Sequence, residues 1–91
     1  MSEIWKFTLT GLRDQTISIP ADAEYLTAQV QDGQAVIWAI VNPDNPVEKR
    51  KIYVYGTGCP LDDSTDFAER WHLGTVQMDG FVWHIFDEGS D

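Results

Sequence analysis

Apolar and polar residues alternate along much of this chain with a period of two, the pattern of strands that bury one face. Trp5, Phe7 and Leu9 alternate with polar residues near the N-terminus, which predicts a strand there. The runs at 16–19 and 51–55 are rich in β-branched and aromatic residues and predict two further strands.

Two Asp-Gly pairs, Asp32-Gly33 and Asp79-Gly80, each lie between two strand-like runs. Asp-Gly favours a two-residue hairpin turn, because both central positions of that turn need a positive φ. The sequence therefore predicts two β-hairpins, one over residues 24–41 and one over residues 70–86.

Counting outward from Asp32-Gly33 gives the register of the first hairpin. Ala28 then pairs with Ile37 and Leu26 with Ala39, and these apolar pairs are expected to face the core. The opposite face then carries Tyr25, Val36, Trp38 and Ile40. The strand over 34–41 is apolar on both faces, which predicts a central position in its sheet.

The same count from Asp79-Gly80 pairs Gly74 with Ile85 in the second hairpin. A glycine in a strand leaves a hole that a neighbouring aromatic ring can cover, and Trp83 is the expected cover. The count places His72 and His84 on opposite faces of the sheet.

These elements add up to about seven short strands, which predicts an all-β, mainly antiparallel fold, either a small sandwich or an open barrel. The stretch 42–49 contains two prolines and is expected to be a loop, and 65–70 is expected to form at most one helical turn. A single domain over 1–91 is expected, with a folded core at 3–87 and a frayed tail at 88–91.

Composition and charge narrow the functional classes. The chain carries a formal net charge of −9 and one cysteine, and its longest apolar run spans 35–41. That run is too short to cross a bilayer, and one cysteine cannot form an internal disulfide. A soluble protein of the host cytoplasm is expected. The negative charge argues against direct binding to nucleic acid or to anionic membranes, and it serves either solubility or attraction to a basic protein.

The stretch YGTGCPLDD, residues 55–63, looks most like chemistry. A dinucleotide fingerprint needs a third glycine where Leu61 stands, and a phosphate loop needs a Gly-Lys-Ser/Thr sequence that is absent. A reactive thiol needs a nearby cation or histidine, whereas the sequence neighbours of Cys59 are acidic. The two glycines are therefore interpreted as the end of a strand, and neither a catalytic residue nor a cofactor is expected.

Metal sites are also not expected. His72 and His84 lack a further ligand at metal-binding spacing, and the acidic stretch 62–69 lacks the glycine and terminal glutamate of a calcium loop.

Six residues are candidates for binding a partner protein. Two are the aromatic residues Tyr25 and Trp38, which either form a second core layer or lie in an exposed docking patch. The other four are the acidic residues Asp62, Asp63, Asp66 and Glu69. A second acidic group lies in the tail and comprises Asp87, Glu88 and Asp91.

The motifs "QTISIPA", "QVQDGQAVIWAIVNPD", "YGTG" and "LGTVQMDGFVWHIF" occur in an order that resembles a family of small uncharacterised proteins from phages and prophages. The resemblance covers about residues 4–87, and it departs from the family at Cys59, where histidine is expected more often. It implies an origin in mobile DNA and supplies no catalytic residues.

The function expected from these observations is protein–protein binding by a non-enzymatic domain. The expected partner is a host or phage protein with a basic surface, and the expected effect is inhibition of a host-defence or nucleic-acid-processing protein, as anti-CRISPR proteins and DNA mimics do. The alternatives are an accessory protein of the virion and a β-barrel that binds a small ligand.

Overall fold

The computed structural model of this chain describes residues 1–10, 13–60 and 71–90, and every regular element in these ranges is a strand. The strands are β1 (Glu3–Thr8), β2 (Arg13–Pro20), β3 (Glu24–Gln31), β4 (Gln34–Val41), β5 (Val47–Gly56), β6 (Trp71–Met78) and β7 (Phe81–Ser90). The predicted helical turn at 65–70 lies outside the described residues. None of the described ranges holds a helix that could cross a membrane.

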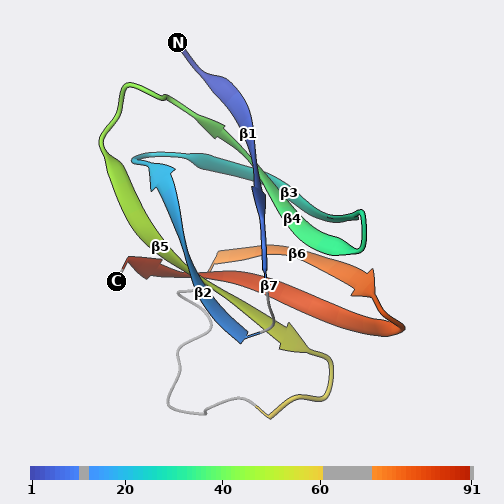
Figure 1. Cartoon of the computed structure of the whole chain (residues 1–91). Helices are drawn as coiled ribbons and strands as arrows, with labels where there is room; N and C mark the ends of the chain where they lie inside the picture. The colour runs from blue at the N-terminus through green and yellow to red at the C-terminus, as the bar shows by residue number, and fades with distance from the viewer. Residues whose placement is uncertain (11–12, 61–70, 91) are drawn as a thin grey trace.

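The strands form two antiparallel sheets (Figure 1), a three-stranded sheet of order β1-β4-β3 and a four-stranded sheet of order β2-β5-β7-β6. The all-β prediction is confirmed, and the two sheets form a small sandwich and not a closed barrel. The predicted central position of the strand over 34–41 is also confirmed, because β4 lies between β1 and β3.

Both Asp-Gly pairs form the predicted hairpin turns. Asp32 and Gly33 have φ values of 53° and 79°, and Asp79 and Gly80 have 55° and 80°. Next to these turns the predicted registers hold, with Ala28 opposite Ile37 and, in the second hairpin, Gly74 opposite Ile85.

The core lies between the two sheets and draws aliphatic side chains from both. The largest fully buried side chains of this core include Ile19, Ile37, Val41, Ile52 and Ile85, each at most 1% exposed. Trp5 and Phe7 pack against this core from β1, as the alternation at the N-terminus predicted.

A β-bulge at Leu26 overturns part of the predicted register of the first hairpin. The pairing shifts between Tyr25 and Thr27, so Tyr25 lies opposite Ala39, where Leu26 was expected. One extra residue in a strand reverses the inward and outward alternation beyond it. Tyr25 therefore points toward the core, and Leu26 is 46% exposed.

A second register shift, between His72 and Gly74, has the same effect in the other hairpin. His72 lies opposite Phe86, whereas a count without a bulge places it opposite Asp87. The prediction that His72 and His84 lie on opposite faces is therefore wrong, because the extra residue Leu73 brings them to the same face.

The glycines of the four-stranded sheet are covered differently from the prediction. Gly74 lies against β3, where an added Cβ would stand 2.8 Å from the Cβ of Ala28. The Trp83 ring covers Gly56 instead, with its Cζ3 3.0 Å from the position that a Cβ would take there. The expected cover of Gly74 by Trp83 is therefore wrong, because the neighbouring sheet already fills that space.

Two boundaries also differ from the sequence pattern. β5 begins at Val47, so the connection from β4 covers 42–46 and is shorter than the expected loop at 42–49. β7 continues to Ser90, and its pairing with β5 extends past residue 87, which the pattern set as the limit of the folded core.

Candidate functional site

The outer face of the three-stranded sheet, turned away from the core, carries an apolar patch. Ile4 on β1 lies opposite Ile40 on β4, and Trp38 lies two residues before Ile40, on the same face. Ile4 is 62% exposed, while Trp38 and Ile40 are half-buried. We call Ile4, Trp38 and Ile40 the outer patch. Leu26, the extra residue of the β3 bulge, adds a further exposed apolar side chain on the strand beside it.

Trp38 is held in place by a cation from the neighbouring strand. The Nζ of Lys6 lies 5.8 Å from the centroid of the Trp38 ring, a cation–π contact, and it donates a hydrogen bond of 2.5 Å to Gln31 on β3. These contacts extend across all three strands. The Trp38 ring is therefore positioned by contacts on the face of the sheet that is turned away from the core.

One acidic residue borders the outer patch directly. Glu24 on β3 lies opposite Ile40, so its exposed side chain extends the row that Ile4 and Ile40 begin. The four acids proposed for partner binding, Asp62, Asp63, Asp66 and Glu69, lie outside the described residues. The sequence analysis missed Ile4, although its apolar side chain at an outward position of the alternation was the available signal.

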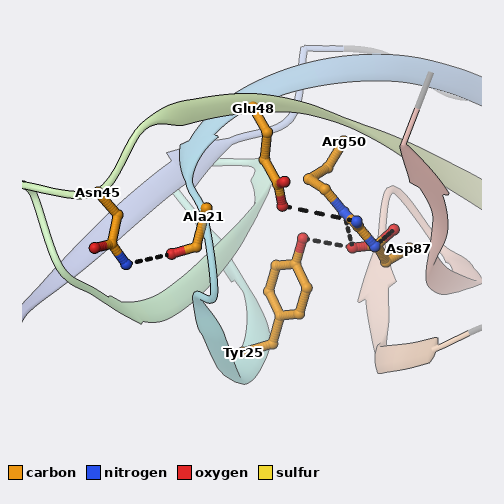
Figure 2. Close-up of polar contacts among 6 residues, drawn as sticks. All are labelled: Ala21, Tyr25, Asn45, Glu48, Arg50 and Asp87. Atoms are coloured by element: carbon orange, nitrogen blue, oxygen red, sulfur yellow. Dashed lines mark hydrogen bonds and ion pairs between the residues drawn. The ribbon is translucent and has the colours of Figure 1, made fainter.

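Tyr25 belongs to a different site, a polar cluster between the two sheets (Figure 2). Asp87 is the acceptor at its centre and its side chain is fully buried. Arg50 on β5 donates from Nε to Oδ2 of Asp87 and from Nη2 to Oδ1, both at 3.1 Å. The hydroxyl of Tyr25 donates to Oδ2 at 2.7 Å. Arg50 is also within 3.7 Å of Glu48.

Asp87 was grouped from the sequence with the acidic residues of the tail, but its side chain is buried. Asp87 lies opposite Ile52, and an extra residue in β7 shifts the register just beyond this pair. Its side chain therefore shares the inward face with Ile52 and Ile85. A buried carboxylate needs a counter-charge and hydrogen-bond donors; Arg50 supplies both, and the neutral hydroxyl of Tyr25 supplies a further donor.

The cluster connects the two sheets electrostatically. Burial raises the pKa of Tyr25 above its usual value of 10.0, and the hydrogen bond to Asp87 raises it further. The hydrogen bond to Asp87 likewise raises the pKa of the Arg50 guanidinium. Since Tyr25 comes from β3, and Arg50 and Asp87 come from β5 and β7, these bonds hold one sheet against the other.

Tyr25→Phe is expected to change how stability depends on alkaline pH. A raised pKa means that the folded state keeps the Tyr25 proton when the unfolded chain begins to lose it, near pH 10. The stability that Tyr25 contributes is therefore complete below pH 10 and falls above it, by at most about 1.4 kcal/mol per pH unit. At pH 7 the variant is expected to lose about 1.5–2 kcal/mol, the value of a hydrogen bond to a charged group.

Urea unfolding at pH 7, 9, 10 and 11 measures this effect. The difference in unfolding free energy between the wild type and Tyr25→Phe should narrow above pH 10. The matched variant Tyr53→Phe, on the outward face of β5, should keep the wild-type pH dependence. Parallel pH curves for the wild type and Tyr25→Phe would contradict the assignment.

The histidines and the YGTGCP loop meet on the outward face of the four-stranded sheet. The hydroxyl of Thr75 lies 3.1 Å from Nε2 of His72 and 3.1 Å from Nδ1 of His84. The hydroxyl of Thr57, in the loop, lies 2.7 Å from Nε2 of His84. Both ring nitrogens of His84 are therefore bound to threonines.

Cys59 is exposed, and its thiol donates to the carbonyl of Pro60 at 3.7 Å. Among residues 1–10, 13–60 and 71–90, no three histidine, cysteine, aspartate or glutamate side chains gather closely enough to hold a metal ion.

Comparison with known proteins places the chain in a protein family whose function is unknown. The model of a domain of unknown function, DUF7352, matches residues 1–91. The chain belongs to the DUF7352 family. The match covers the outer patch, the polar cluster and the YGTGCP loop alike, so all three are parts of one DUF7352 domain. No curated protein and no solved structure matches the chain.

Proposed function

We propose that this chain acts by protein–protein binding, with the outer patch docking onto a partner that has a basic surface. The observation that carries the proposal is the exposure of Ile4 and its position beside Ile40 and Trp38 on a sheet face. Exposed apolar side chains gathered on one face are typical of docking surfaces. A tryptophan near the centre of such a surface is a frequent hot spot for binding energy.

Charge selects the kind of partner. The chain carries a net charge of −9, and Glu24 borders the outer patch. Complementary charge mainly speeds association and makes it sensitive to salt, while the desolvated apolar contacts slow dissociation. The overall charge of the chain therefore favours a partner with a basic surface, while the apolar contacts of the outer patch would set the dissociation rate.

We further propose that a phage or prophage encodes this chain and that the chain acts in the host cytoplasm. The partner is then a host-defence or nucleic-acid-processing protein, whose surface is basic because it binds phosphates, and binding inhibits that protein. The support is the negative charge of the chain together with the order of its motifs.

Ile4→Glu is expected to abolish capture of the partner from a host lysate, while Val47→Glu retains it. The two residues form a matched pair, because Ile4 is 62% exposed and Val47 is 65% exposed. Both substitutions add the same charge, but Val47 lies on the four-stranded sheet. A charge at the centre of a hot spot should weaken binding at least 30-fold, which corresponds to about 2 kcal/mol.

The measurement is affinity capture by tagged protein followed by a titration of the captured partner at two salt concentrations. Each variant is first checked for a melting temperature close to that of the wild type. Equal capture by both variants, or selective loss with Val47→Glu, would overturn the placement of the docking face.

A further inference from the structure

A groove lies at the end of the four-stranded sheet, between the YGTGCP loop and the turn that joins β6 to β7. Its volume is about 610 Å³, and it is lined by both loops and by the start of β7. Phe81 and Trp83 form its aromatic wall, with ring centroids 6.0 Å apart and planes inclined at 58°. Phe81 is 65% exposed. Small-molecule sites in proteins are mostly apolar clefts of roughly 300–1,000 Å³.

The part of the groove lining that the structure describes holds no aspartate, glutamate, lysine, arginine or histidine, although charged residues make up 23% of the chain. An anionic ligand would lose its hydration in such a groove without gaining a cation as a partner, because the described lining holds none. The groove therefore disfavours an anionic ligand.

Several hydrogen-bonding groups of the loop side are already bound within the protein. The N–H of Thr57 donates to the carbonyl of Val82 at 3.0 Å, and the N–H of Cys59 donates to the carbonyl of Gly56 at 3.0 Å. The hydroxyl of Thr57 is paired with His84. Because these groups already form hydrogen bonds within the protein, they do not favour a polar ligand in the groove.

The Trp83 ring in the aromatic wall is also held by contacts within the protein. The indole N–H of Trp83 donates to the carbonyl of Met78 at 3.1 Å. The Trp83 ring also packs against the backbone of Gly56, where a Cβ would stand only 3.0 Å from the ring. The ring is thus fixed by a hydrogen bond and by backbone contact, while Phe81 beside it remains exposed. Fixed aromatic rings recognise other aromatic rings by offset or edge-to-face contact.

We propose that this groove binds a small aromatic molecule that carries no negative charge. The site lies on the four-stranded sheet, apart from the outer patch, and goes beyond the proposed protein binding without depending on it. The volume exceeds what one side chain of a protein partner fills, which favours a small molecule as the occupant.

Titration with 2-naphthol, followed by backbone amide shifts, tests the proposal. The amides of residues 56–59 and 80–83 should shift together and saturate. The comparison probe is 2-naphthoate, which has the same rings and an anionic carboxylate, and it is measured at about 0.5 M salt so that the overall charge of −9 is screened. It should bind at least tenfold more weakly, because the described lining offers its carboxylate no cation.

Two variants locate the site. Phe81→Ser should weaken 2-naphthol binding at least tenfold, whereas Val47→Ser, at an equally exposed residue at the opposite end of β5, should leave it unchanged. The proposal is overturned if 2-naphthol shifts no amides in these ranges, if 2-naphthoate binds equally well, or if both variants behave alike. It is also overturned if Phe81→Ser removes capture of a protein partner while 2-naphthol fails to bind.

Discussion

Arg50→Met is expected to lower the free energy of unfolding by about 3 kcal/mol, a large part of the stability of a domain of this size. The side chain of Asp87 is fully buried, while that of Arg50 is 26% exposed. Removing Arg50 therefore leaves a carboxylate inside the sandwich without its counter-ion. The expected loss is at the lower end of the range for a broken buried pair, because Tyr25 still donates to Asp87.

Lys51→Met is the matched control, since it removes a cation from the next position of the same strand. Lys51 pairs with Asp14 at 3.4 Å, and the two side chains are 42% and 52% exposed. Such a surface pair contributes less than about 1 kcal/mol. The double variant Arg50→Met/Asp87→Asn should recover part of the loss, because the stranded charge is gone. Equal losses for the two single variants, measured by urea unfolding, would show that the cluster contributes no more than a surface pair.

Gly74→Ala is expected to destabilise the fold by about 2 kcal/mol through overpacking. The added Cβ would stand 2.8 Å from the Cβ of Ala28 and 3.3 Å from its backbone N. These atoms belong to the opposite sheet, so the new methyl group would push β3 and β6 apart. In a domain of this size each kcal/mol lowers the melting temperature by roughly 4–8 °C.

The double variant Gly74→Ala/Ala28→Gly separates overpacking from a general intolerance of alanine in β6. It removes the methyl group that Gly74→Ala meets, so it should be more stable than the sum of the two single losses, by at least about 1 kcal/mol. Strict additivity in thermal denaturation would mean that the close approach of the two sheets is not the cause.

The sequence predicted this fold well near its turns and poorly beyond its bulges. The Asp32-Gly33 turn set the register correctly as far as Trp38, so this residue was correctly assigned to the face turned away from the core. The bulge at Leu26 reversed the alternation just beyond that point and turned Tyr25 into the core. No residue type at Leu26 signals a bulge, since an extra residue is fixed by how the strand packs against the rest of the sandwich.

The polar cluster could not be predicted for the same reason. Its three central side chains come from β3, β5 and β7, and Tyr25 reaches the cluster only because the bulge at Leu26 turns it inward. In the sequence, Asp87 stands at the start of the acidic, polar stretch 87–91, which is typical of a solvated tail. Its burial depends on the pairing of β7 with β5, which is a long-range property of the sheet.

Site-specific photo-cross-linking tests the central claim, that the outer patch is the docking face, most directly. Benzoylphenylalanine is placed at position 4 in one variant and at position 47 in another, and each is irradiated in host lysate. Cross-linking from position 4 to one protein with a basic surface, and its absence from position 47, is the predicted result. A partner that cross-links from position 47 and not from position 4 would contradict the account.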